Sequence, residues 1–245
     1  MSIASEITRL QQAKSDLATS IANKGVTVPA ATTIDGYATL VDQIQTGSPL
    51  PYDARIEYLR CSGTQYINTG IKGSSDIKIR LRCLYQICTS SSSTSYGWIF
   101  GSRVAASNKA YNLVHTYSGN FRFGSGTATN WANSATRIVT FDNTESTNVM
   151  KVYDASNTLI ATMTASSATF NNNLDLYLFG NNTNGTAGLG SDITIYSCEF
   201  YNGSTKIAEF IPVRVGQVGC MYDKVSGSFF YNQGTGSFVL GPDVV

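Results

Sequence analysis

The sequence predicts a mainly β protein: an antiparallel two-sheet sandwich preceded by a short segment of two helices. Three observations support this class. A helical spacing of apolar residues occurs only before residue 48 of the 245. Beyond it, short runs of alternating apolar and polar residues are separated by turn residues. Charged residues make up only 13% of the chain, which has 22 Gly, 14 Tyr and 11 Phe, a composition that favours short strands and tight turns.

The first element is expected to be an amphipathic helix over residues 3–21. Its apolar positions recur at alternating intervals of four and three residues, like the a and d positions of a coiled coil. Ser2 can cap its start, and Lys24-Gly25 is a typical stop at which Gly takes the left-handed conformation. The stripe is also the candidate surface for anchoring and oligomerisation, and it consists of Ile3, Ile7, Leu10, Lys14, Leu17 and Ile21.

A second helix is expected after a connector that contains Pro29. Thr32-Thr33-Ile34-Asp35 matches a capping box, and Thr46-Gly47-Ser48-Pro49 ends the segment. Residues 1–48 are therefore assigned to an N-terminal helical segment, and residues 52–245 to the sandwich. The apolar positions of the second helix are Ile34, Tyr37, Val41 and Ile44.

Two helices of this size cannot bury both of their apolar stripes against each other, and isolated helices of this length are marginal in water. The uncovered faces are expected to pack on the β domain, on the same helix of sister chains or on another protein. Lys14 within the stripe would fix the register and oligomeric state of a helical bundle. Alternatively, Lys14 extends its ammonium group into water at the edge of an ordinary helix hairpin.

From residue 52 onward the helical period disappears, and no helix separates the expected strands, which excludes a doubly wound α/β fold. About 195 residues suffice for a substantial core. In one predicted hairpin, Asp223 and Ser226 hydrogen-bond the turn and Gly227 supplies a positive φ. Strands are expected at 54–59, 76–82, 97–101, 111–115, 120–123, 136–141, 149–153, 158–163, 175–179, 193–201, 206–213, 218–222, 228–231 and 237–240.

Composition and charge argue against several classes of partner. The net charge is +1 without a run of like charges, so the electrostatic footprint of a nucleic-acid-binding protein is missing. No apolar stretch of about 18 residues predicts membrane insertion, and residues 1–30 lack the pattern of a secretory signal. The five cysteines are widely spaced, which favours free thiols in a reducing cytoplasm over disulfides or a zinc site: Cys61, Cys83, Cys88, Cys198 and Cys220.

The two ends of the sandwich resemble the LamG/concanavalin A-like domains of bacteriophage structural proteins. Ile211-Pro212-Val213-Arg214 and the run from Gly219 to Phe238 are similar to a C-terminal signature of these domains. The run from Glu57 to Gly70 is similar to their first strands, and Trp98-Ile99-Phe100-Gly101-Ser102-Arg103 to a middle strand. Residues 3–46 resemble the helical segment of phage tail and fibre proteins. The resemblance implies a jelly-roll sandwich in a virion component, with an N-terminal anchor and a displayed distal surface.

The sequence contains little evidence of a catalytic site. The single histidine, His115, lies in an alternating run and has no associated Gly-x-Ser-x-Gly elbow. A retaining glycosidase needs two carboxyl groups about 5 Å apart, but no Glu has a carboxylate two residues away. Asp142 and Glu145, the closest pair in the β region, flank a predicted turn at Asn143-Thr144. We therefore expect no enzyme activity and no cofactor.

One segment is a candidate for metal binding. Residues 181–192 are rich in Asn and Gly and offer oxygen ligands of the kind that Ca²⁺ prefers. The segment contains a single carboxylate and lacks the spacing of a calcium loop, so a flexible loop is favoured.

Sugar recognition requires aromatic faces together with planar amides or guanidinium groups. Trp131 is the best candidate because it lies in a segment of turn composition; the alternative is that it closes one end of the core. Trp98 is assigned to the core. The candidate ligand-binding residues are Trp131, Asn130, Asn133, Arg122 and Tyr117.

Together these features predict a tail or head fibre-type protein of a phage particle, made in the bacterial cytoplasm. The helices would bind other virion proteins and assemble a homo-oligomer, with a trimer favoured. The sandwich would adhere to a host-surface glycan. The alternatives are an architectural capsid-decoration or tail-assembly protein without a host ligand and, with less support, a glycan-degrading enzyme.

Overall fold

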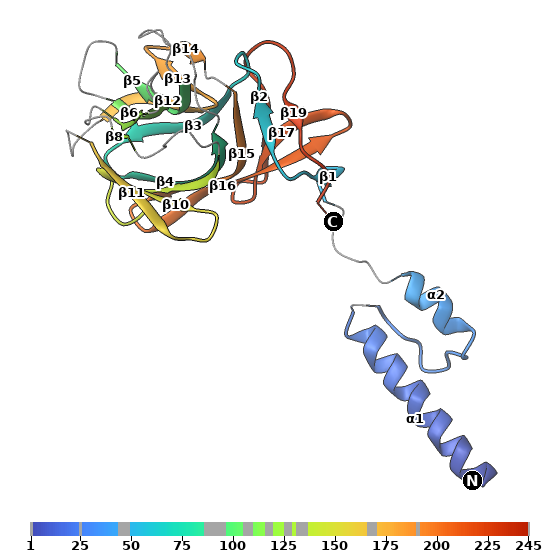
Figure 1. Cartoon of the computed structure of the whole chain (residues 1–245). Coiled ribbons are helices and arrows are strands. Elements are labelled where there is room, and N and C mark those ends of the chain that lie inside the picture. Colours follow the sequence, from blue (N-terminus) through green and yellow to red (C-terminus); the bar gives the residue numbers. More distant parts are fainter. Residues whose placement is uncertain are drawn as a thin grey trace. The chain divides into compact units, whose positions relative to one another are not determined.

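The computed structural model divides the chain into two compact units, Met1–Pro51 and Tyr52–Val245 (Figure 1). Each is described by itself below. The residues that the structure describes are 2–24, 26–43, 50–85, 97–104, 110–115, 120–124, 129–130, 137–165, 171–189 and 192–244.

The first unit contains helix α1 (Ile3–Ala22), whose start is capped as predicted. The backbone N–H of Ser5 donates to the Ser2 hydroxyl at 3.2 Å, which satisfies one of the free donors of the first turn. The helix ends at a C-cap residue, Asn23, in right-handed conformation. The predicted stop residue Gly25 lies outside the described residues.

Helix α2 (Gly36–Asp42) is shorter than predicted, and the capping box is wrong. The N-cap is Asp35, which already has helical backbone angles and whose side chain makes no cap hydrogen bond. Instead, the Thr32 hydroxyl donates to the carbonyl of Pro29. The threonine side chain thus stabilises the turn that precedes the helix, so the helix begins later than expected. Ile44 lies outside the described residues.

The second unit is a sandwich of two mainly antiparallel sheets, which Figure 1 shows as two layers. Among the described residues, one sheet has eleven strands, with the central order β11-β10-β9-β4-β15-β16-β17-β18. Its strands are β1 (Ala54–Arg55), β2 (Leu59–Cys61), β4 (Ile77–Tyr85), β9 (Arg137–Asp142), β10 (Val149–Asp154), β11 (Leu159–Thr164), β15 (Ile193–Asn202), β16 (Thr205–Val215), β17 (Val218–Asp223), β18 (Ser228–Phe230) and β19 (Val239–Leu240).

The other sheet has eight strands in the described part of the chain, with the order β14-β13-β5-β6-β7-β8 and with β12 pairing both β3 and β5. One pairing, β13 with β5, is parallel. The strands of this sheet are β3 (Ile67–Ser74), β5 (Gly97–Arg103), β6 (Ala110–His115), β7 (Asn120–Phe123), β8 (Thr129–Asn130), β12 (Asn171–Leu178), β13 (Gly180–Thr183) and β14 (Thr186–Leu189).

The main core lies between the inner faces of the two sheets. It is built from alternate residues of the strands, as expected where each strand buries one face. Its largest fully buried side chains include Phe100, Phe121, Phe123, Phe141, Phe200 and Phe210. The four cysteines in the described residues are free and buried, as predicted: Cys61, Cys83, Cys198 and Cys220; Cys88 lies outside these residues.

The prediction of a mainly β fold with two N-terminal helices is confirmed. The predicted hairpin at the C-terminal end is also correct: the Asp223 carboxylate accepts from the N–H groups of Val225 and Ser226, and Gly227 has φ +70°. Two further predictions were wrong. Residues 54–59 form two strands rather than one, and residues 181–189 belong to the hairpin β13–β14 rather than to a flexible loop.

Among the described residues, no helix has the length and apolar character needed to span a membrane.

Candidate functional site

Two of the five predicted sugar-binding residues lie at one end of the eight-stranded sheet. Arg122 lies in β7, and Asn130 ends β8, where its backbone pairs with that of Asn120. Tyr117, Trp131 and Asn133 lie outside the described residues, so their placement stays a prediction. Strand pairing brings β7 and β8 together, and Arg122 is the member of the set whose side chain is described.

Arg122 points away from the core. Its neighbours Phe121 and Phe123 are both buried between the sheets, so the alternation of the strand places Arg122 on the outer face. The residue is half-buried, and its Nε is buried without a hydrogen-bond partner among the described residues. An unpaired buried donor costs about 1–3 kcal/mol, so it requires a structural or functional explanation.

A row of three residues extends from Arg122 across the outer face. Val114 of β6 pairs with Arg122 on one side and with Trp98 of β5 on the other. Since neighbouring strands are about 4.8 Å apart, the backbones of Arg122 and Trp98 are about 10 Å apart. The structure therefore places an aromatic residue and a guanidinium group on the same face, two strands apart.

Trp98 is buried, as predicted, but it packs outside the main core cluster between the sheets. The pairing of β5 with β6 shifts in register between Trp98 and Phe100. Ile99 and Phe100 both reach the core, and Trp98 lies on the outer face, where the guanidinium carbon of Arg103 is 4.9 Å from its ring centroid. Only 7% of Trp98 is exposed, so the indole supports Arg103 rather than offering an open stacking surface.

A chain of hydrogen bonds fixes Arg103 further. The Nδ2 of Asn112 donates to Oδ1 of Asn181 at 3.3 Å, and Nδ2 of Asn181 donates to the Thr183 hydroxyl at 2.9 Å. The same hydroxyl accepts from Nε of Arg103 at 3.2 Å. Both asparagines are buried. The network connects β6, β13 and β5 and holds one guanidinium group in a defined position.

Gly101 makes room for this network. Its φ of +142° is unfavourable for other residues, and a Cβ there would lie 2.2 Å from Cβ of Asn112. The glycine therefore allows Asn112 to lie against the neighbouring strand. Sequence reasoning included Gly101 only in a resemblance and missed this steric role.

The same outer face continues onto β12 and β3. Tyr177 stacks against Tyr66 with ring centroids 4.7 Å apart, and Asp175 pairs with Lys72 at 2.7 Å. Partial burial opposes ionisation of Asp175, but hydrogen bonds from Lys72 and Asn68 outweigh it, and the pKa of the carboxyl lies below its ordinary value. This carboxylate is thus ionised and paired at neutral pH.

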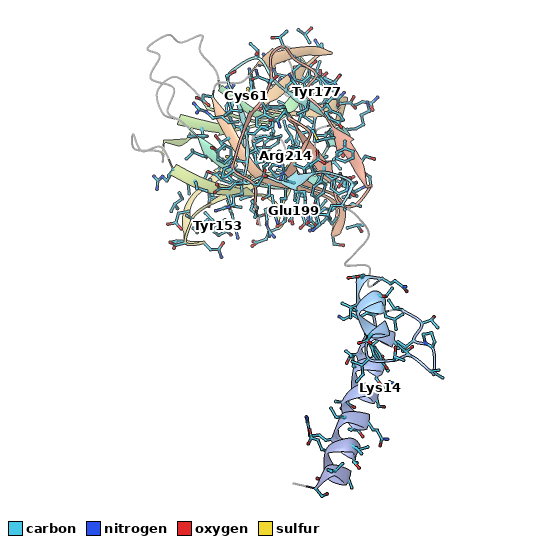
Figure 2. All side chains as sticks on the ribbon, turned by 90° about the vertical axis from the view of Figure 1, so that its right-hand side faces the viewer. Lys14, Cys61, Tyr153, Tyr177, Glu199 and Arg214 are labelled. Carbon is cyan, nitrogen blue, oxygen red and sulfur yellow. The ribbon has the colours of Figure 1, made fainter. Side chains whose placement is uncertain are left out.

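The outer face of the eleven-stranded sheet has a different character. Glu199 and Glu209 are opposite each other on β15 and β16, and Nζ of Lys206 contacts them at 2.8 and 2.9 Å. Hydrogen bonds from Lys224 and Lys206 lower the pKa of Glu209. Burial opposes ionisation of Glu199, but Lys206 and Tyr201 outweigh it and its pKa is also lowered. This pair lacks the raised pKa of a general acid. Figure 2 shows Tyr177 and Glu199 on opposite sides of the sandwich.

The described residues contain no group of three or more His, Cys, Asp or Glu side chains placed to hold a metal ion. In the Asn/Gly segment, the side-chain oxygens of Asn181 and Asn182 already accept hydrogen bonds, from Asn112 and from the N–H of Gly185. Asp192 is paired with Arg60. These oxygens are therefore already engaged in hydrogen bonds or an ion pair within the protein.

No family model matches the chain, and no curated protein matches it in sequence. Solved structures with a similar arrangement include the carbohydrate-binding module CBM40 of the Ruminococcus gnavus IT-sialidase, at 12% identity and TM-score 0.41, covering 60% of this chain and 90% of that one. The same module bound to α2,3-sialyllactose is 13% identical with a TM-score of 0.42, and the match covers 62% of this chain and 92% of that one. A Bacteroides ovatus protein assigned to carbohydrate binding is 10% identical with a TM-score of 0.46, and the match covers 76% of this chain and 60% of that one. These identities and scores establish no common family.

Proposed function

We propose that this chain is a non-catalytic, glycan-binding component of a bacteriophage particle. The sandwich would bind a host-surface glycan, and the N-terminal helices would attach it to other virion proteins and assemble it into an oligomer, with a trimer favoured. The observation that carries the binding function is the outer face of β5, β6, β7 and β13, where Arg103 is held on Trp98 and Arg122 lies two strands away from Trp98.

This face suits sugar binding because its polar groups are positioned before a ligand arrives. Arg103 is fixed by a ring and a hydroxyl, so little conformational entropy is lost when its remaining N–H groups donate to sugar hydroxyls. Guanidinium groups offer several donors in one plane, which matches neighbouring hydroxyls on a sugar ring.

The helical unit supports the anchoring role. Ile3, Ile7, Leu10 and Leu17 of the predicted stripe are exposed, at 83, 51, 49 and 42%. Ile21 is covered within the unit by Val26, Tyr37 and Leu40, and Lys14 is half-buried. An apolar row of this length on a helix surface favours contact with another polypeptide.

A glycan microarray probed with the full-length protein tests the binding function. Arg103→Ala is expected to lower the signal at least about tenfold, because one anchored donor group is removed. Arg82→Ala is the matched control, since Arg82 also covers an aromatic ring, that of Tyr196, at 5.0 Å, but lies on the eleven-stranded sheet. Its signal should equal that of the unaltered protein.

Absence of any glycan signal from the unaltered protein would contradict the adhesion function and favour a purely architectural protein. Equal losses in both variants would contradict the assigned face. Antibody labelling of phage particles would test the location, with label expected at an exposed appendage.

A further inference from the structure

The two arginines of the candidate site differ from most other cations of the sandwich in having no carboxylate partner. All 16 Asp and Glu residues of the chain lie in its described parts. Arg60, Arg80, Arg214, Lys72, Lys151, Lys206 and Lys224 each pair with at least one of them. Arg103 and Arg122 make no ion pair with any of these described carboxylates, so their positive charge is uncompensated at close range.

The sequence around the two arginines is free of acids over a long span. No Asp or Glu occurs between Asp76 and Asp142; of the seven Lys and Arg residues in this span, Arg103 and Arg122 lie in strands of the eight-stranded sheet, and four others lie in β4 and β9 of the other sheet. This span includes β5, β6, β7 and β8, which form one side of the eight-stranded sheet. In the strands of that sheet the single carboxylate is Asp175, which pairs with Lys72. The overall charge of +1 conceals this local excess.

We propose that the ligand of this face is an acidic glycan, whose carboxylate or sulfate group accepts hydrogen bonds from Arg122 while Arg103 contacts the sugar that bears it. This inference rests on the proposed glycan-binding function and specifies its ligand class. Among the described residues, Arg122 has no ion-pair partner and its buried Nε has no hydrogen-bond partner, so an oxyanion that contacts the terminal Nη groups of this half-buried side chain supplies acceptors that the guanidinium group lacks.

The position of Arg103 supports the same ligand class. Trp98 and Thr183 fix its guanidinium group, and the buried amides of Asn112 and Asn181 hold the threonine in turn. A fixed fork of donors recognises planar and tetrahedral oxyanions better than a mobile ammonium group does. A neutral sugar would leave both charges without a counterpart, which lowers the affinity for it.

The test uses the full-length protein on an array that carries neutral, carboxylated and sulfated glycans. Binding is expected only to acidic glycans, and the relative signals of carboxylated and sulfated members identify which oxyanion is preferred. Arg122→Gln should reduce the acidic-glycan signal at least about tenfold, and Arg122→Lys should give an intermediate signal because charge remains but the fork is lost. Arg82→Gln on the other sheet should bind like the unaltered protein.

Salt provides a second measurement, because contacts between exposed charges are screened. Raising NaCl from about 50 mM to about 500 mM should weaken acidic-glycan binding severalfold. Binding to neutral glycans with equal strength, or an Arg122→Gln protein that melts normally and keeps its signal, would overturn the acidic-glycan proposal and leave glycan binding intact. Absence of binding to every glycan would overturn both proposals.

Discussion

Asn143 illustrates what a single buried side chain does in this fold. Its Oδ1 accepts from the backbone N–H of Ile79 at 2.6 Å, and its Nδ2 donates to the carbonyl of Thr147 and the hydroxyl of Tyr111, each at 3.1 Å. Tyr111 is fully buried, and burial raises the pKa of its hydroxyl. One amide therefore connects β4, β6 and the turn after β9.

Asn143→Ala is expected to destabilise the protein by about 2–4 kcal/mol, because several buried polar groups lose their partner. Chemical denaturation measures this difference. Asn202→Ala is the control, since Asn202 is exposed and should cost less than about 0.5 kcal/mol. Equal midpoints for the two variants would contradict the structural role of Asn143.

For single residues, the sequence predicted the local structure, such as a turn, more reliably than the direction of the side chain. Asn143-Thr144 was correctly expected to lie in a turn, but the inward direction of the amide depends on β4 and β6, which are distant in sequence. Trp98 was assigned to the core because it lies among apolar residues. The register shift beside it, which no local pattern reveals, turns it outward. The acid-free span from Asp76 to Asp142 could have been found by counting.

Strands that bury one face were predicted best, because alternation is a local signal that burial produces directly. β7, at Asn120–Phe123, matches the predicted residues, and most other strand boundaries differ by one or two residues. β3 was not among the predicted strands, and β13 and β14 were also missed; these last two are rich in Asn, Thr and Gly. Side-chain amides of this hairpin form hydrogen bonds with Asn112 of β6 and with the carbonyl of Asp175 of β12. The sequence pattern does not reveal these contacts.

The paired charges across β15 and β16 give the molecule an acid-sensitive element. The pKa values of Glu199 and Glu209 are lowered in the folded chain, so their stabilisation is fully present above their ordinary range near pH 4.5 and is lost as the pH falls through the lowered values. Lys206 contacts both carboxylates.

Lys206→Met should therefore lower the free energy of unfolding by about 1 kcal/mol at pH 7 and by clearly less near pH 3. Denaturation at the two pH values measures the change. Lys78→Met is the control, since Lys78 donates to the carbonyl of Thr144 and makes no ion pair among the described residues. A loss that is the same at both pH values for Lys206→Met would contradict the assignment.

At the scale of the whole molecule, the chain combines a sandwich with a large core and a helical unit whose described residues form a small core of Ile21, Val26, Tyr37 and Leu40. The sequence predicted that the first helix would leave an apolar stripe uncovered by the second, and four of its six positions are exposed. In our proposal a second polypeptide covers these positions, and one sequence does not specify which.

Leu10→Ser combined with Leu17→Ser is expected to reduce the oligomer that we propose to monomers, as measured by light scattering of the full-length protein. The control changes Gln12 and Thr19 to Ser, two exposed positions with the same spacing of seven residues on another face of α1. Identical masses for the unaltered protein and both double variants would contradict helix-mediated assembly.

The entry of the chain into the sandwich has a mechanical consequence. β1 pairs only Ala54 and Arg55 with β16, Ile56 forms a single bridge to Asp243, and Asp243 is clamped by Arg214. If the N-terminal unit attaches the protein to a particle while the sandwich is bound to a glycan, tension enters the sandwich at Tyr52. The backbone pairs of β1 and the buried side chain of Ile56 therefore bear this load before it reaches the long central strands.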